Sequence, residues 1–107
     1  MWIFLNDAYF SIVHKDCAAH EVLVRARRKG DIERHFLVPA TSVDHADYQY
    51  RAVIERAWLA RVLSEQAYKI DYDNFKDSVR NKSLARTYNA VWAAAGGAAR
   101  YEEWWAQ

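Results

Sequence analysis

The sequence predicts an α+β fold: a sheet of about four strands, made of an N-terminal hairpin and two further strands, with helices on one face. Up to about residue 54, apolar residues alternate with polar ones, which is the period of a half-buried strand. Beyond that point they recur at the period of an amphipathic helix, so the C-terminal half is expected to be helical. The 107 residues fit one core that needs no disulfide or metal to fold.

The first two strands are predicted to form a hairpin. Residues 2–5 and 9–14 are rich in β-branched and aromatic residues. Between them stand Asn6 and Asp7, which tolerate the left-handed backbone of a tight turn.

The next two strands carry arginines. In residues 20–27 an apolar set alternates with a set that includes Arg25 and Arg27, so these two arginines share one face. Residues 48–54 form the fourth strand, and Arg51 joins the same face if the two strands are neighbours, which the sequence leaves open. Guanidinium groups so close together need carboxylates or a bound anion, since like charges opposite each other are destabilising.

Along the chain, helices are expected both before and after the fourth strand. Asp31 is the predicted N-cap of a short helix, and residues 39–47 are predicted to be loop. An apolar stripe over residues 59–70 predicts an amphipathic helix. Asp71 or Asp73 is expected to cap a further helix.

The last helix is expected to begin near Ser83 and to end at Gly96-Gly97. This end divides the chain into a single α+β domain of residues 1–97 and an aromatic tail of residues 98–107. The tail carries Trp104 and Trp105, which either fold back over the core or bind a partner.

The arginines have two possible kinds of partner. Inside the chain, Asp71, Asp73 and Glu55 are the carboxylates expected to pair with them. Outside the chain, the partner would be a nucleic-acid phosphate or an acidic protein, because sheet faces that combine arginines and aromatics bind single-stranded nucleic acid.

One cluster has metal-ligand spacing: His14, Cys17 and His20 are each two residues apart. A closed zinc site needs a fourth ligand, for which Asp16, His35 or His45 would have to serve. The cluster lies in a predicted hairpin connection, where polar residues need no special reason, and no second pair with metal spacing follows. We therefore predict no metal and no cofactor.

The sequence carries no catalytic signature. No nucleophile elbow supports a triad, and three glycines form no phosphate-binding loop. Capping and the helix dipole account for Asp71 and Asp73 without acid–base chemistry. The prediction is that the protein is not an enzyme.

Composition limits which binding partners and which cell compartment are expected. The net charge of +1 is not the footprint of a general nucleic-acid binder. Five tryptophans are more than a chain of this size buries comfortably, which favours a partner or a dimer. The single cysteine, Cys17, suits a reducing cytoplasm. The apolar N-terminus lacks a basic region and is interrupted at Asn6, so neither a signal peptide nor a membrane span is predicted.

Several ordered motifs follow one another between Trp2 and Trp92: Phe10-Ser11-Ile12-Val13, Val24-Arg25-Ala26-Arg27, Gly30-Asp31-Ile32-Glu33-Arg34, Tyr50-Arg51-Ala52, Ile70-Asp71-Tyr72-Asp73-Asn74-Phe75-Lys76 and Val91-Trp92. Together they resemble a widespread family of small bacterial proteins. The resemblance implies a lineage and a cytoplasmic setting, and it brings no activity or catalytic residues with it.

The sequence therefore favours a non-enzymatic cytoplasmic protein-interaction module: an adaptor, a regulatory subunit or an inhibitor. Its partner is expected to be another protein or a second copy of the chain. The candidate binding residues are Arg25, Arg27, Arg51, Trp104 and Trp105. The alternative is a small nucleic-acid-binding regulator that uses the arginine-bearing face of the sheet.

Overall fold

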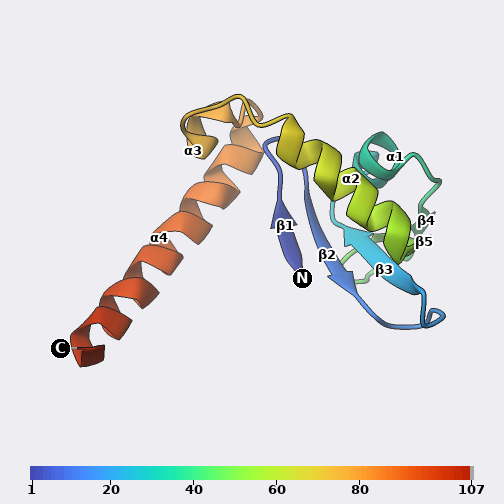
Figure 1. Ribbon diagram of the computed structural model, residues 1–107, viewed down its shortest axis with the longest axis horizontal. Helices are drawn as coiled ribbons and strands as arrows, with labels where there is room; N and C mark the ends of the chain where they lie inside the picture. The colour runs from blue at the N-terminus through green and yellow to red at the C-terminus, as the bar shows by residue number, and fades with distance from the viewer. Residues whose placement is uncertain (107) are drawn as a thin grey trace. The chain divides into compact units, whose positions relative to one another are not determined.

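A computed structural model describes the backbone of residues 1–106 and the side chains of residues 1–97. By its internal contacts the chain forms two compact units, Met1–Asp71 and Tyr72–Gln107. Whether residues 1–97 act as one domain stays a prediction. The elements follow one another along the chain (Figure 1) as β1 (Trp2–Phe4), β2 (Tyr9–Val13), β3 (Glu21–Ala26), α1 (Asp31–Phe36), β4 (Thr41–Ser42), β5 (Tyr50–Glu55), α2 (Arg56–Tyr68), α3 (Phe75–Ser78) and α4 (Lys82–Ala106).

The unit Met1–Asp71 contains an antiparallel sheet of five strands in the order β1-β2-β3-β5-β4. The α+β class and the helical C-terminal half are confirmed, and the sheet has one strand more than predicted. The extra strand is β4, which lies inside the segment predicted to be loop. Its two residues are too few to show a strand period in the sequence.

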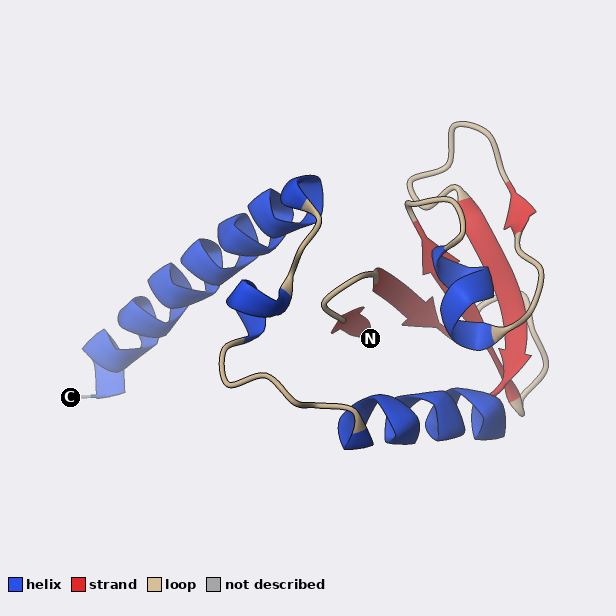
Figure 2. Cartoon of the chain, turned by 90° about the horizontal axis from the view of Figure 1, so that it is seen from above, coloured by secondary structure: helices blue, strands red, loops and turns tan. Residues whose placement is uncertain are grey.

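Helices α1 and α2 pack against the same face of this sheet (Figure 2). The core between them is built from alternate strand residues and from one side of each helix, because successive strand side chains point to opposite faces. Its buried apolar side chains are those of Ala8, Phe10, Ile12, Val22, Val24, Ala26, Ile32, Phe36, Ile54, Leu59 and Val62.

The apolar stripe of α2 is buried only in the first half of the helix. Leu59 and Val62 are buried, whereas Ala67 is exposed. The helix ends at Tyr68, so Ile70, which the stripe also includes, lies beyond it and is 57% exposed. The prediction of one continuous stripe over residues 59–70 was wrong in its last turn.

A network of charged side chains joins α1 to the turn between β1 and β2. The Arg34 guanidinium donates to Asp7 Oδ2 at 3.3 Å and to Asp31 Oδ1 at 2.9 Å. His35 Nε2 lies 2.9 Å from Asp7 Oδ1. Burial alone would lower the pKa of Arg34, but the two carboxylates raise that pKa above its ordinary value.

Asp31 is not the N-cap of α1, as the sequence had predicted. The N-cap is Gly30, whose φ of 91° favours glycine, and Asp31 is the first residue of the helix. The Asp31 side chain is 2% exposed and pairs with Arg34 instead of capping the helix.

In the unit Tyr72–Gln107, asparagines cap both helices. Asn74 Oδ1 accepts from the backbone N–H of Asp77, and Asn81 Oδ1 accepts from that of Leu84 at 2.9 Å. The predicted caps at Asp71, Asp73 and Ser83 were therefore wrong by one to three residues. Asparagine is as good a cap as aspartate or serine, so composition alone does not choose among close neighbours.

Helix α4 continues through Gly96-Gly97 to Ala106, so the prediction that it ends there was wrong. A glycine inside a helix costs about 1 kcal/mol relative to alanine. The alanines on both sides of the pair are the strongest helix formers, which offsets that cost.

Aromatic rings join α3 to the first turns of α4. The rings of Phe75 and Tyr88 are stacked with centroids 5.6 Å apart, and Tyr72 meets Phe75 edge to face at 5.8 Å. Lys76 Nζ lies 3.8 Å from the centroid of the Trp92 ring. These contacts lie at the N-terminal end of α4.

Replacing Phe36 by alanine should destabilise the protein by about 3–5 kcal/mol. Its side chain is 1% exposed and meets the Phe10 ring edge to face at 5.0 Å. The neighbouring Leu37 is 74% exposed, so Leu37→Ala should change stability by less than about 0.5 kcal/mol. Urea denaturation of both variants checks the difference, and equal losses would contradict this packing.

Candidate functional site

The candidate site lies on the side of the sheet opposite α1 and α2, here called the arginine face. Residues paired across the strands share a face, and one such row runs through all five strands. It consists of Trp2, Ser11, Arg25, Arg51 and Thr41. Arg25 and Arg51 are therefore directly opposite each other, which settles the neighbour relation that the sequence left open.

Arg25 is held by a hydroxyl and an aromatic ring. Its Nη2 donates to Ser11 Oγ at 2.6 Å, and its guanidinium carbon lies 4.9 Å from the centroid of the Tyr48 ring. Its Nε is buried without a hydrogen-bond partner in the described part of the chain. Because one donor of this charged group is buried and unsatisfied, the stability of Arg25 in this position depends strongly on the contacts that it does make.

Arg27 contacts the same ring from a second position. Its guanidinium carbon lies 4.7 Å from the Tyr48 centroid, and its Nη2 donates to Asp47 Oδ1 at 3.0 Å. Both side chains of this ion pair are largely exposed, so the pair adds about 1 kcal/mol or less. Burial lowers the pKa of Arg27, but a hydrogen bond with Tyr9 and electrostatic interactions with Tyr9, Tyr48 and Asp47 raise it overall.

Arg51 is fixed by the backbone. Its Nε donates to the carbonyl oxygen of Tyr48 at 3.1 Å. Tyr48 therefore contacts all three arginines: its ring faces Arg25 and Arg27, and its carbonyl accepts from Arg51. The Tyr48 side chain is buried by these contacts, with 7% of the residue exposed.

The internal partners of the arginines differ from those predicted. The carboxylate is Asp47 of the β4–β5 connection, whereas Asp71, Asp73 and Glu55 are exposed. Asp47 lies in the predicted loop and Tyr48 at the start of the predicted fourth strand, which in the structure begins only at Tyr50, and no spacing in the sequence indicates that either residue contacts the arginines. Ser11 was detectable, since it is the only polar residue in a strand of otherwise apolar and aromatic residues.

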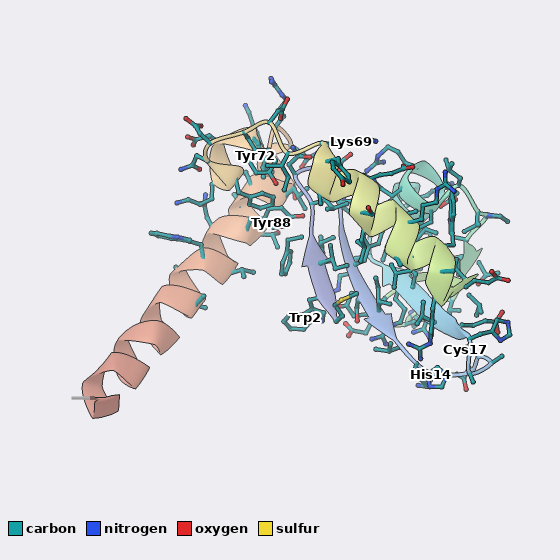
Figure 3. The ribbon with its side chains drawn as sticks, viewed as in Figure 1. Trp2, His14, Cys17, Lys69, Tyr72 and Tyr88 are labelled. Carbon is teal, nitrogen blue, oxygen red and sulfur yellow. The ribbon has the colours of Figure 1, made fainter. Side chains whose placement is uncertain are left out.

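The residues with metal-ligand spacing lie around the β2–β3 connection (Figure 3). His14 Nε2 is 3.2 Å from the carbonyl oxygen of Ala18, and Cys17 Sγ donates to that of Glu21 at 3.6 Å. His20 is exposed. In the described part of the chain, no three His, Cys, Asp or Glu side chains gather where they could hold a metal ion.

Trp104 and Trp105 fall within the range of α4, and their side chains lie outside the described residues. The structure instead adds two exposed tryptophans. Trp2 on β1 is 71% exposed and Trp92 on α4 is 63% exposed. Trp92 follows the apolar spacing of Leu84 and Tyr88, which predicts a buried position for it, and its exposure departs from that prediction.

No protein-family model, curated protein or solved structure matches this chain. The resemblance to a family of small bacterial proteins therefore stays a prediction. Among the helices of the described residues, none is both long enough and apolar enough to cross a membrane.

Replacing Ser11 by alanine should lower the free energy of unfolding by about 1.5–3 kcal/mol, because it removes an acceptor from a charged group that already has one buried orphan donor. Ser64→Ala, on the exposed side of α2, is the matched control and should change stability by less than about 0.5 kcal/mol. Thermal and urea unfolding measure both. A Ser11 variant as stable as the control would show that Arg25 does not depend on this bond.

Proposed function

We propose that the protein is a non-enzymatic cytoplasmic interaction module, acting as an adaptor, a regulatory subunit or an inhibitor. The observation that carries the proposal is the exposure of large aromatic side chains, Trp2 on the sheet and Trp92 on α4. Exposed tryptophans are typical of protein interfaces, where they act as binding hot spots. Trp104 and Trp105, which also fall within the range of α4, are proposed to take part in partner binding.

The apolar stripe of α4 supports this proposal. Leu84 and Tyr88 are buried, whereas Val91 and Trp92, one turn later in the same stripe, are 42% and 63% exposed. The stripe of an amphipathic helix ordinarily faces a core, so its exposed continuation favours cover by another polypeptide. A second copy of this chain is the simplest such partner, since both copies would offer the same stripe.

We expect Trp92→Ser to weaken self-association by about thirtyfold, the effect of losing a hot spot worth about 2 kcal/mol. The stability of the monomer should change by less, because Trp92 is largely exposed. Light scattering over a concentration series gives the dissociation constants. Tyr68→Ser, at a residue that is 90% exposed on α2, is the control.

The proposal of self-association fails if the wild-type chain stays monomeric at high concentration. If native extract then yields a partner that binds the wild type and the Trp92 variant equally, the exposed stripe is not the interface.

A second candidate function is binding of single-stranded nucleic acid through the arginine face. The observation that favours it is the direct opposition of Arg25 and Arg51, neither of which has a carboxylate within ion-pair distance in the described part of the chain. Tyr9 lies on the same face, where its ring stacks on that of Phe4 with centroids 5.9 Å apart and adds aromatic surface of the kind that bases stack on.

This candidate predicts a steep dependence of affinity on salt. With about two phosphate contacts, the logarithm of the association constant should fall by about 1.4 per tenfold rise in salt. A labelled oligothymidine titrated at several salt concentrations measures the slope, and Arg51→Gln should halve it. Arg61→Gln, an exposed arginine on α2, is the control. A flat salt profile would exclude this function.

A further inference from the structure

An open pocket of about 560 Å³ lies on the arginine face next to β4. This volume is within the range of small-ligand sites. Strand residues and the connections before β3 and β4 form its lining. The residues that matter to the argument are Leu23, Val38, Pro39, Val53, Arg51 and Asp16.

The pocket combines apolar walls with one positive charge. Val53 is 44% exposed and lies beside the buried Leu23, so an aliphatic group in the pocket would cover the apolar surface of Val53 that water now contacts. Arg51 uses its Nε on the Tyr48 carbonyl, which fixes the guanidinium and leaves the two Nη groups without a hydrogen bond to any described residue. A planar guanidinium with two parallel donors matches a carboxylate.

Asp16 lines the same pocket and narrows the choice of anion. Its carboxylate would repel a doubly charged phosphate more strongly than a singly charged carboxylate, and it can accept a hydrogen bond from an N–H group. The last residue of a polypeptide is a ligand that carries a carboxylate, an aliphatic group and an N–H within a few bonds. Its backbone amide, side chain and terminal carboxylate meet these three requirements.

We propose that this pocket binds the C-terminal residue of a partner polypeptide, with Arg51 holding the free carboxylate and Leu23, Val38 and Val53 holding an aliphatic side chain. The inference rests on the proposed interaction function and names how one kind of partner is recognised. An internal segment of a partner lacks the terminal carboxylate and is not expected to bind here.

The test is an NMR titration of the full ¹⁵N-labelled chain with acetyl-Gly-Leu, which has a free carboxylate, and with the same dipeptide as its C-terminal amide. The acid should shift the resonances of Leu23, Val53 and Arg51 Nε and bind about tenfold or more tightly than the amide, since a hydrogen bond to a charged group is lost in the latter. Hexanoate, which has no N–H, should bind more weakly than acetyl-Gly-Leu.

Two variants test whether acetyl-Gly-Leu binds in this pocket. Arg51→Gln should reduce the affinity for acetyl-Gly-Leu about tenfold or more, whereas Arg61→Gln should leave it unchanged. Because Arg51→Gln also loses its bond to Tyr48, Val53→Glu is the second variant: Val53 is partly exposed, so the fold should remain, and the new carboxylate should abolish binding.

The inference is overturned if acid and amide bind equally, if hexanoate matches the dipeptide, or if Val53→Glu binds as the wild type does. These results do not depend on any natural partner. A protein captured from extract equally well by wild type and Arg51→Gln would leave the interaction function standing and remove only this mode of recognition.

Discussion

The structure of the unit Met1–Asp71 depends on the alternation of side chains along β3. Val22, Val24 and Ala26 must face the helices, because they supply the centre of the core. Arg25 is thereby turned to the opposite face, and the register with β5 brings Arg51 directly across from it. Hydrophobic burial on one face thus places two like charges opposite each other on the other face, where they repel each other.

Tyr48 offsets most of this repulsion by contacting all three arginines, without supplying a full negative charge. Its ring offers the negative face of a π-system to two guanidinium groups, and its backbone carbonyl accepts from the third. Ser11 completes the shell of Arg25. The arginine face is therefore ordered by neutral groups and by one exposed carboxylate, that of Asp47.

The sequence predicted what depends on local period and failed where distant contacts decide. The hairpin, the arginine-bearing strands and the amphipathic helices were found because their patterns extend over several residues. The partners of the arginines were not, because Asp47 lies in a predicted loop and Tyr48 at the first residue of a predicted strand, and they contact the arginines only once β3 and β5 have paired. The end of α4 was misplaced for a related reason: Gly96-Gly97 is a stop signal by composition, and the surrounding alanines outweigh it.

The charged network at the β1–β2 turn has a consequence for how the sheet opens. Strand β1 has three residues and pairs only with β2, so backbone bonds alone would leave it among the first parts to fray. Asp7, in the turn that follows β1, is held by Arg34 and His35 of α1. Loosening this edge of the sheet therefore breaks side-chain bonds to α1, and we expect the amide protons of the two elements to exchange with solvent together.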